Sequence, residues 1–276
     1  MKHALTIDLE DWHQIVEWKV RGRLSGCSPH VVEQTETLLQ DLADAKVKAT
    51  FFVLGMVAQA QPGLVRSVAG AGHEIASHGW SHRLVYQQEP DEFRQETRKS
   101  KELLEQLTGR PCRGYRAAEF SLIRKSLWAL DILGELGFTY DSSIFPAEGR
   151  RYGIQGSPLG AHVRKISGGN SLLEIPPSVL AWGGRLWPVA GGGYFRLAPW
   201  TLTRWAIRKM EKEGRAAVAY FHPYDFSSSP LRLDRQTRVE TFRHPQLLGF
   251  HNSFREKNRK KFRRLLGCFS WGTLLD

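Results

Sequence analysis

Cysteine is scarce in this sequence of 276 residues. The three cysteines, Cys27, Cys112 and Cys268, lie far apart and are odd in number, and no Cys-x-x-Cys pair occurs. The sequence therefore encodes neither a disulfide framework nor a zinc site built from thiolates. We expect three free thiols in a reducing compartment.

Long apolar runs are also absent. No stretch reaches the roughly 20 apolar residues that a membrane-spanning helix requires, and no basic segment followed by an apolar one opens the sequence as a secretory signal would. These absences predict a cytoplasmic protein, with the inner face of the cytoplasmic membrane as one location within that compartment. Neither a Gly-x-Gly-x-x-Gly segment after the first strand nor a phosphate-binding lysine loop occurs, which disfavours a nucleotide enzyme.

What the sequence does contain is enough apolar material for a full core and an excess of positive charge. Hydrophobic residues make up 41% of the chain, and 39 Lys and Arg against 28 Asp and Glu give a formal charge of +11. Such a charge suits an anionic membrane surface, an acidic glycan or another polyanion. No nucleic-acid-binding signature accompanies it, so we do not expect a nucleic acid partner.

Strand and helix patterns alternate along most of the chain, which predicts a single α/β domain. The tail looks like a basic helix over 252–266, so we assign 1–225 to the barrel and 226–276 to a basic extension packed on it. Two Gly-rich stretches, 145–170 and 187–196, are predicted to be loops. About seven parallel strands joined by helices indicate a closed or nearly closed barrel, with its active site at the carboxyl ends of the strands. The predicted strands end at Asp8, Leu54, His78, Ala118, Tyr140, Ile175 and His222.

A pair of histidines follows one of these strands at metal-binding spacing. His78 and His82 are four residues apart, and Gly79 beside the first allows the chain to turn sharply. A catalytic metal site commonly has three protein ligands and one open position, so a third ligand is needed. The candidates are the carboxylates at the end of the first strand: Asp8, Glu10 and Asp11.

The order of the strand-end motifs resembles that of the NodB-homology polysaccharide deacetylases, in the branch associated with bacterial exopolysaccharide and exosortase clusters. The stretches that carry the resemblance are Thr6-Ile7-Asp8, Ser77-His78-Gly79-Trp80-Ser81-His82, Gly114-Tyr115-Arg116-Ala117, Tyr140-Asp141-Ser142-Ser143 and Phe221-His222-Pro223, with further likeness at 47–55, 191–196 and 269–272. The resemblance implies a distorted (β/α) barrel that uses a divalent metal to hydrolyse N-acetyl groups on amino sugars.

The same resemblance implies roles for individual residues. Asp8 would be the base that takes a proton from water, and Arg116 would keep it ionised and oriented. His222 would be the general acid that protonates the departing amine, and Asp141 would orient a neighbouring histidine. His78 and His82 would bind the metal, which we expect to be zinc, although such ligands also accept cobalt, manganese or iron.

Two departures from the family pattern affect the site. The family's Arg-x-Pro turn reads Arg116-Ala117-Ala118 here, and the usual adjacent Asp-Asp reads Asp8-Leu9-Glu10-Asp11. Side chains alternate across a strand, so Glu10 shares a face with Asp8 and is favoured as the third metal ligand. Asp11 remains the alternative if the chain turns at Glu10.

Three aromatic residues, Trp187, Tyr194 and Phe195, are candidates for stacking on sugar rings. The function favoured by this reading is the removal of N-acetyl groups from a bacterial exopolysaccharide or its lipid-linked precursor, and a cytoplasmic location favours the precursor. The alternatives are a cyclic amide hydrolase of the same fold and a barrel that has lost catalysis and only binds carbohydrate. A basic surface would also allow peripheral contact with an anionic membrane.

Overall fold

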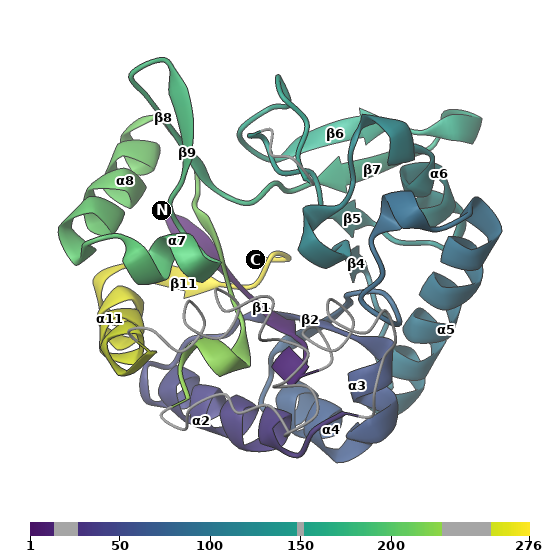
Figure 1. The fold of residues 1–276 in the computed structure, drawn as a ribbon, viewed down its shortest axis with the longest axis horizontal. Helices are drawn as coiled ribbons and strands as arrows, with labels where there is room; N and C mark the ends of the chain where they lie inside the picture. The colour runs from purple at the N-terminus through teal and green to yellow at the C-terminus, as the bar shows by residue number, and fades with distance from the viewer. Residues whose placement is uncertain (14–26, 148–151, 228–254) are drawn as a thin grey trace, which may run out of the picture.

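The computed structural model of the protein describes residues 1–13, 27–147, 152–227 and 255–276. The predicted α/β architecture is confirmed: a curled, mostly parallel sheet lies at the centre, and helices surround its outer side (Figure 1). The helices are α2 (His30–Asp44), α3 (Gly55–Ala60), α4 (Pro62–Gly70), α5 (Pro90–Thr108), α6 (Trp128–Glu135), α7 (Gly192–Leu197), α8 (Trp200–Lys212) and α11 (Arg255–Cys268).

The sheet runs in the spatial order β10-β1-β2-β3-β4-β5-β7-β6, and β11 pairs with β1. All these pairs are parallel except β6 with β7. Among the described residues the path has two ends, at β10 and β6, so these strands form a curled half-barrel rather than a closed barrel. The strands are β1 (Lys2–Leu9), β2 (Thr50–Val53), β3 (Glu74–Ser77), β4 (Gly114–Tyr115), β5 (Tyr140–Asp141), β6 (His162–Lys165), β7 (Ser171–Glu174), β10 (Val218–Phe221) and β11 (Ser270–Gly272).

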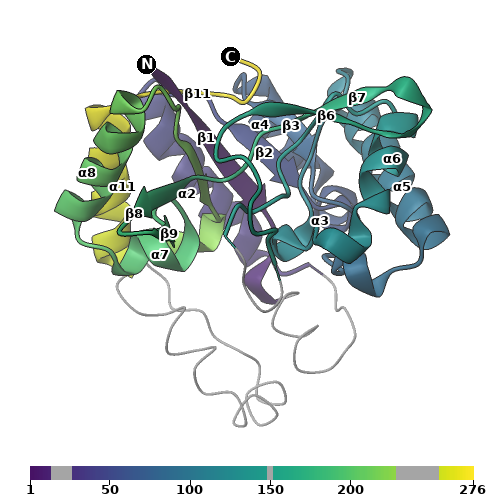
Figure 2. The same ribbon diagram turned by 90° about the horizontal axis from the view of Figure 1, so that it is seen from above.

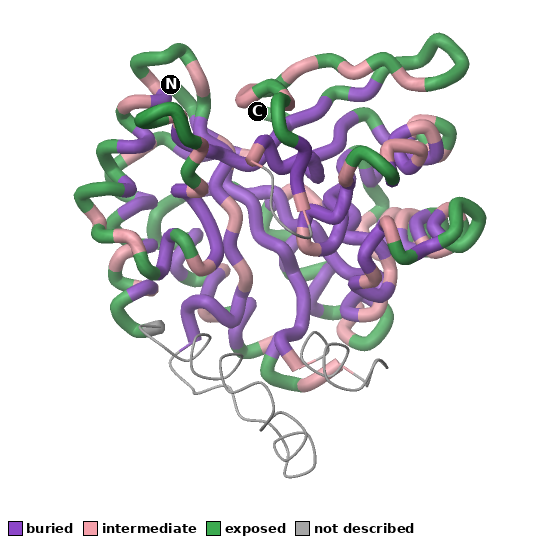
Figure 3. The backbone as a smooth tube through the Cα atoms, turned by 45° about the horizontal axis from the view of Figure 1, so that its top comes forward, coloured by how far each residue is buried: buried purple, intermediate pink, exposed green. Residues whose placement is uncertain are grey.

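The alternation of side chains along β1 explains why its polar residues face the inside of the barrel. Leu5, Ile7 and Leu9 are fully buried in the main apolar core between sheet and helices. Thr6 and Asp8 point to the opposite face, into the barrel, where both accept hydrogen bonds from Arg116. Figure 3 shows the central strands buried along most of their length. The strand pattern therefore separates an apolar outer face from a polar inner one.

Helix α5 illustrates how local sequence sets an element's bounds. Pro90 occupies its first turn, where a missing N–H does no harm. Glu89 and Glu92 form a reciprocal capping box at its start, and Gly109, in the left-handed region at φ 66°, ends it. Both ends of the helix are therefore set by residues at or next to its first and last turns.

The two predicted loops contain regular structure that the sequence reading missed. Strand β6 lies inside 145–170, and the stretch 187–196 holds the end of a β-hairpin and most of α7. The hairpin pairs β8 (Val179–Trp182) with β9 (Arg185–Pro188). Its two-residue turn is Gly183-Gly184, with φ values of 60° and 72°, the conformation that favours glycine in tight hairpins.

The basic tail contributes to the fold more directly than a solvated helix would. Arg259 and Arg263 of α11 both donate hydrogen bonds to the buried carboxylate of Asp41, at 2.8 Å from their Nε atoms. Lys261 Nζ donates to the carbonyl oxygen of Ala198 at 2.8 Å, beyond the end of α7. After α11 the chain returns to the sheet as β11. Three cations of this helix are thus hydrogen-bonded to other elements of the chain.

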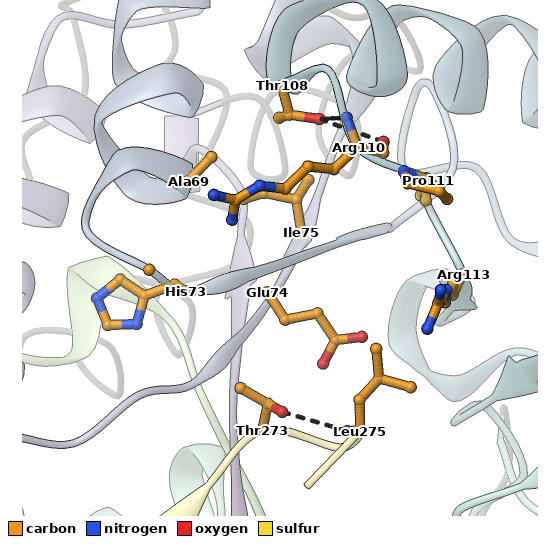
Figure 4. A pocket seen from close by; sticks show the side chains of 12 residues that line it. Ala69, His73, Glu74, Ile75, Thr108, Arg110, Pro111, Arg113, Thr273 and Leu275 are labelled. Atoms are coloured by element: carbon orange, nitrogen blue, oxygen red, sulfur yellow. Dashed lines mark hydrogen bonds between the residues drawn. The ribbon is translucent and has the colours of Figure 1, made fainter.

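A pocket of about 320 Å³ lies at the amino ends of β3 and β4 (Figure 4). His73 and Glu74 line it from the start of β3, and Arg110 and Arg113 line it from the segment before β4. His78 lies at the other end of β3. The pocket and the metal-binding motif therefore lie at opposite ends of the strands. Seen from above, the arrow of β1 points away from the ends of the chain (Figure 2).

Candidate metal centre and active site

Four of the predicted site residues lie at the carboxyl ends of parallel strands, the edge expected from the sequence. Asp8 is near the end of β1, His78 directly follows β3, Arg116 follows β4, and His222 follows β10. Because neighbouring parallel strands end on the same side of a sheet, segments more than 200 residues apart in the chain meet here. The candidate metal ligands and the candidate proton-transfer groups are thereby brought to one edge.

Glu10, His78 and His82 converge on one point. His82 Nε2 lies 2.8 Å from Glu10 Oε2, and His78 Nε2 lies 3.6 Å from the same oxygen. Each residue offers one ligand atom within 4.8 Å of the other two, and all three are buried. Ligands at about 2.0–2.1 Å from a tetrahedral zinc ion are roughly 3.3 Å apart. Two nitrogens and one carboxylate oxygen at this spacing fit a divalent metal.

The chain between the two imidazoles turns tightly against α3. Gly79 has a φ of 77° and His82 a φ of 57°, so both lie in the left-handed region. Gly55 N donates to Gly79 O at 2.9 Å, and the Trp80 ring packs so close to Gly55 that a Cβ there would lie 2.3 Å from it. A left-handed histidine is unfavourable on its own, and such residues are typical of functional sites. Contacts with α3 hold the turn.

A backbone contact fixes the tautomer of His78. Its Nδ1 lies 2.8 Å from the carbonyl oxygen of Arg116. Because a carbonyl can only accept, Nδ1 carries the proton and Nε2 is free to bind a cation. Arg116 therefore orients a candidate metal ligand through its backbone carbonyl, in addition to placing its own side chain beside Asp8.

Arg116 and Asp8 form a fully buried ion pair. Arg116 Nη1 donates to Asp8 Oδ1 at 2.8 Å and to Thr6 Oγ1 at 2.7 Å. Its other nitrogens donate to Ser142, Nε to the carbonyl oxygen at 3.2 Å and Nη2 to the hydroxyl at 2.8 Å. The guanidinium carbon also lies 4.1 Å from the centre of the Phe52 ring. This network holds the Asp8 carboxylate in one orientation.

Glu10 is held as a carboxylate by the groups around it. Burial alone raises the pKa of Glu10, but the imidazoles of His82, His222 and His78 outweigh burial and hold it well below its usual range. Tyr224 donates its hydroxyl to Glu10 Oε1 at 2.8 Å. The second oxygen, Oε2, faces the histidine pair. Glu10 is thus ionised and oriented for a cation.

His222 lies beside this cluster and is fixed from its other side by Asp225. His222 Nε2 is 3.4 Å from Glu10 Oε1, and Nδ1 is 2.9 Å from Asp225 Oδ2. Asp225 also accepts from the backbone N–H of His222 at 3.0 Å and pairs with the buried guanidinium of Arg196. Burial lowers the pKa of His222, but the charges of Glu10 and Asp225 outweigh burial and raise it to about 9. The ring is therefore held ready to carry a proton on Nε2.

The structure corrects the expectation that Asp141 orients a histidine. Its carboxylate instead accepts from the hydroxyl and backbone N–H of Ser143, at 2.5 and 3.1 Å. Asp141 also pairs in register with Glu174 on β7. Burial raises the pKa of Asp141, and burial together with the Asp141 charge raises that of Glu174 well above its usual range. Burial therefore disfavours the charged form of both carboxyl groups behind the arginine loop.

Asp11 lies away from the metal-binding cluster. It accepts hydrogen bonds from the backbone N–H and the hydroxyl of Ser28, at 2.5 and 3.0 Å, and from the backbone N–H of His13 at 3.1 Å. These contacts connect the end of β1 to the segment before α2. Of the two carboxylates left open by the sequence, Glu10 is the one placed beside the histidines.

The three aromatic candidates have different environments. Phe195 is fully buried, with its ring 4.9 Å from that of Phe221, so the expectation that it stacks on a sugar is wrong. Trp187 is exposed on the β8–β9 hairpin. Tyr194 is 43% exposed, and its hydroxyl lies 2.9 Å from that of Tyr152. Trp187 and Tyr194 are the exposed members of this set, and both remain candidates for glycan contact.

Asp225, Arg196 and Tyr224 are site residues that the sequence reading missed. Asp225 had a signal, since it lies three residues after His222 in a short 3₁₀ turn that brings its carboxylate back to the ring. Tyr224 stacks on His222, with ring centres 4.8 Å apart and planes 6° from parallel. Arg196 had no comparable signal, because its partner is 29 residues away.

Comparison with known proteins places these features in context. The family model described as polysaccharide deacetylase matches residues 27–140, and a domain of unknown function, DUF3473, matches residues 142–276. The chain is 38% identical over 78 residues to a peptidoglycan-N-acetylglucosamine deacetylase of Bacillus cereus, which covers 28% of each protein. It is 46% identical over 57 residues to a chitooligosaccharide deacetylase of Rhizobium leguminosarum bv. trifolii, or 21% of this chain and 25% of the relative.

Similarity of fold extends over the whole chain. A crystal structure of a candidate polysaccharide deacetylase from Mycobacterium smegmatis superimposes with a TM-score of 0.62 at 22% identity, covering 98% of this chain and 86% of the other. The two curated relatives, in contrast, are matched over only about a quarter of their length. Within the described parts of the chain, no helix combines the length and apolar character needed to cross a bilayer.

Proposed function

Because this chain belongs to the polysaccharide deacetylase family, we propose that it hydrolyses N-acetyl groups of amino sugars with the help of a divalent metal. The observation that carries the proposal is the meeting of three groups at one sheet edge. These are the Glu10, His78 and His82 cluster, the ion pair of Asp8 with Arg116, and His222 held by Asp225.

Glu10, His78 and His82 would hold the metal. A divalent cation bound there would polarise the acetyl carbonyl and lower the pKa of a water molecule toward neutrality. Two imidazole nitrogens and one carboxylate oxygen suit zinc, and they also accept cobalt, manganese or iron. The buried, oriented state of all three side chains supports this assignment.

Asp8 is the residue placed to accept a proton from water. Its pairing with Arg116 fixes its orientation and leaves one carboxylate oxygen for the substrate water. As the water oxygen bonds to the acetyl carbon, the carbon–nitrogen bond breaks and acetate and a free amine result. The amine nitrogen must gain a proton during this step.

His222 is the residue placed to supply that proton. Asp225 accepts from Nδ1, so the proton on Nε2 points toward the metal-binding edge. The stacked ring of Tyr224 limits movement of the imidazole. Positioned acids of this kind typically contribute about 10²–10⁴-fold to rate.

The substrate we propose is a bacterial exopolysaccharide or its lipid-linked precursor. The peptidoglycan and chitooligosaccharide deacetylases among the relatives support an N-acetylated glycan in general, and the DUF3473 match fits the exopolysaccharide-associated branch. Tyr194, exposed and hydrogen-bonded to Tyr152, offers an aromatic surface for a sugar. A carbohydrate-binding barrel without catalysis would need none of Asp8, Arg116 and His222 in this arrangement.

Acetate release from a chitooligosaccharide by the purified, metal-loaded protein tests the proposal. We expect turnover that His222→Ala reduces by about 10²–10⁴-fold while the metal content stays equal to that of the wild type. A small cyclic amide serves as the competing substrate. Turnover of that compound alone would favour the cyclic amide hydrolase, and no turnover of either would favour the carbohydrate-binding alternative.

A further inference from the structure

An exposed apolar patch lies on the β8–β9 hairpin and α8, outside the metal-binding edge. Its members are Trp182, Trp187, Leu202 and Trp205, which we call the tryptophan face. Their exposed fractions are 60, 45, 43 and 41%. Large apolar side chains seldom form a contiguous exposed patch on a globular domain. Several such side chains exposed together therefore indicate a contact surface.

The geometry of the hairpin directs these rings away from the catalytic edge. Trp182 and Trp187 share one face of the hairpin because side chains alternate along its strands. Leu186, on the opposite face, packs with the cluster of Phe120 and Tyr220 near the active site. The tryptophans therefore do not line the catalytic edge.

Contacts within the tryptophan face hold it as one surface. The rings of Trp182 and Trp205 meet edge to face at 5.9 Å, which joins the hairpin to α8. Trp187 Nε1 donates to the carbonyl oxygen of Trp182 at 3.2 Å. Leu202 lies three residues before Trp205, on the same side of α8. Figure 1 shows the hairpin projecting beside α8.

Positive charge accompanies the patch. Arg185 shares the hairpin face of Trp182, directly across the strand pair, and is exposed. Arg204 is exposed on α8 next to Trp205. The chain as a whole carries a formal charge of +11. Tryptophan with arginine at its rim is the composition that suits the boundary between lipid headgroups and acyl chains.

We propose that the tryptophan face binds the surface of a bilayer containing anionic lipid, with its rings at the headgroup level and Arg185 and Arg204 against the phosphates. The composition of the patch favours this occupant, because its rings offer an apolar surface and the two guanidinium groups at its rim offer positive charge for lipid phosphates. The tail helix is the weaker candidate, because Arg259, Lys261 and Arg263 are engaged within the chain. The proposal does not depend on catalysis.

Flotation with vesicles of phosphatidylcholine and phosphatidylglycerol, at low and high salt, tests this surface. We expect Trp182→Ser with Trp205→Ser to reduce vesicle partitioning by at least about 10-fold. Arg185→Gln with Arg204→Gln should reduce it by about 30-fold at low salt, from about 1 kcal/mol per cation. The controls are Val163→Ser, which removes a 68% exposed side chain elsewhere, and Lys257→Gln with Lys260→Gln on the tail helix.

Three outcomes would overturn the proposal. The wild type could fail to bind vesicles at low salt, the tail variant could lose binding while the tryptophan variant keeps it, or the tryptophan variant could lose binding to a chitooligosaccharide instead. Quenching of tryptophan fluorescence by brominated lipid gives a second readout, and it should fall in the Trp182 and Trp205 variant. Since vesicle binding is measured without turnover, its failure is distinguishable from a failure of the deacetylase proposal.

Discussion

Asp225 Oδ2 lies 2.9 Å from Nδ1 of His222, and the same carboxylate accepts the backbone N–H of that histidine. One acidic residue thus fixes both the position and the tautomer of the proposed general acid. A second buried charge, Arg196, pairs with Asp225 from the other side. The orienting carboxylate therefore comes from the same loop as the histidine and not from the strand end at Asp141.

Asp225→Asn should lower kcat by about 10²-fold or more, because an amide stabilises protonated His222 less well than a carboxylate does. Metal content should not change. Asp141→Asn serves as the comparison and should affect kcat much less, since Asp141 contacts Ser143. Equal losses in the two variants would return the orienting role to Asp141. Thermal unfolding of both proteins shows whether either variant loses activity merely by losing stability.

Glu10→Gln should reduce metal retention after dialysis, whereas Asp11→Asn should retain the metal. Glu10 faces both imidazoles, while Asp11 is occupied by Ser28. Metal analysis of the two proteins, prepared side by side, measures the difference. A protein that keeps its metal without the Glu10 carboxylate would show that the cluster has another third ligand.

Chelation should abolish acetate release, and single divalent metals should restore it to different degrees. We expect zinc to restore activity, with cobalt, manganese and iron as the other members of the panel. His78→Ala and His82→Ala should each remain inactive after the same treatment. Activity that survives complete removal of metal would contradict the proposed chemistry.

Arg116→Lys should lower kcat even though it keeps the positive charge. A lysine ammonium cannot reproduce the planar set of donors that reaches Asp8, Thr6 and Ser142 together. We expect a loss of about 10²-fold or more, with KM changed less, because Asp8 would lose its fixed orientation. Substrate-saturation kinetics separate the two parameters, and an unchanged kcat would show that the charge alone suffices.

His73 should make folding stability depend on pH. Its Nδ1 accepts the backbone N–H of Ala49 at 3.1 Å, and burial lowers its pKa to about 4, against 6.5 without burial. Its contribution is complete above pH 6.5 and is lost as the pH falls toward 4, because the unfolded chain binds the proton first. The expected loss between pH 7 and 4.5 is about 2.5 kcal/mol.

Urea unfolding of the wild type and of His73→Gln at the two pH values isolates this effect. Glutamine can accept the same N–H but does not titrate, so its stability should fall less on acidification. An equal fall in both proteins would mean that His73 is not the responsible group.

Much of the fold could be predicted from the sequence because strands and helices follow local patterns of apolar and polar residues. Alternating strand and helix signals predicted seven of the sheet strands, and Pro90 and Gly109 are local signals found at the two ends of α5. The hairpin at Gly183-Gly184 was missed because its strands are short and it lies within a stretch rich in glycine and proline. Strand β11 was missed because three residues carry too weak a signal, and pairing with β1 is what makes them a strand.

The sequence by itself determined which residues could do the chemistry: the His78 and His82 pair, the strand-end carboxylates, Arg116 and His222. Parity along β1 also favoured Glu10 over Asp11. Only the tertiary structure decided which carboxylate holds His222, that Phe195 is buried, and that Arg259 and Arg263 bind Asp41. The reason is physical: the spacing of residues along one element follows from fixed backbone geometry, whereas contacts between distant segments depend on how the whole barrel packs.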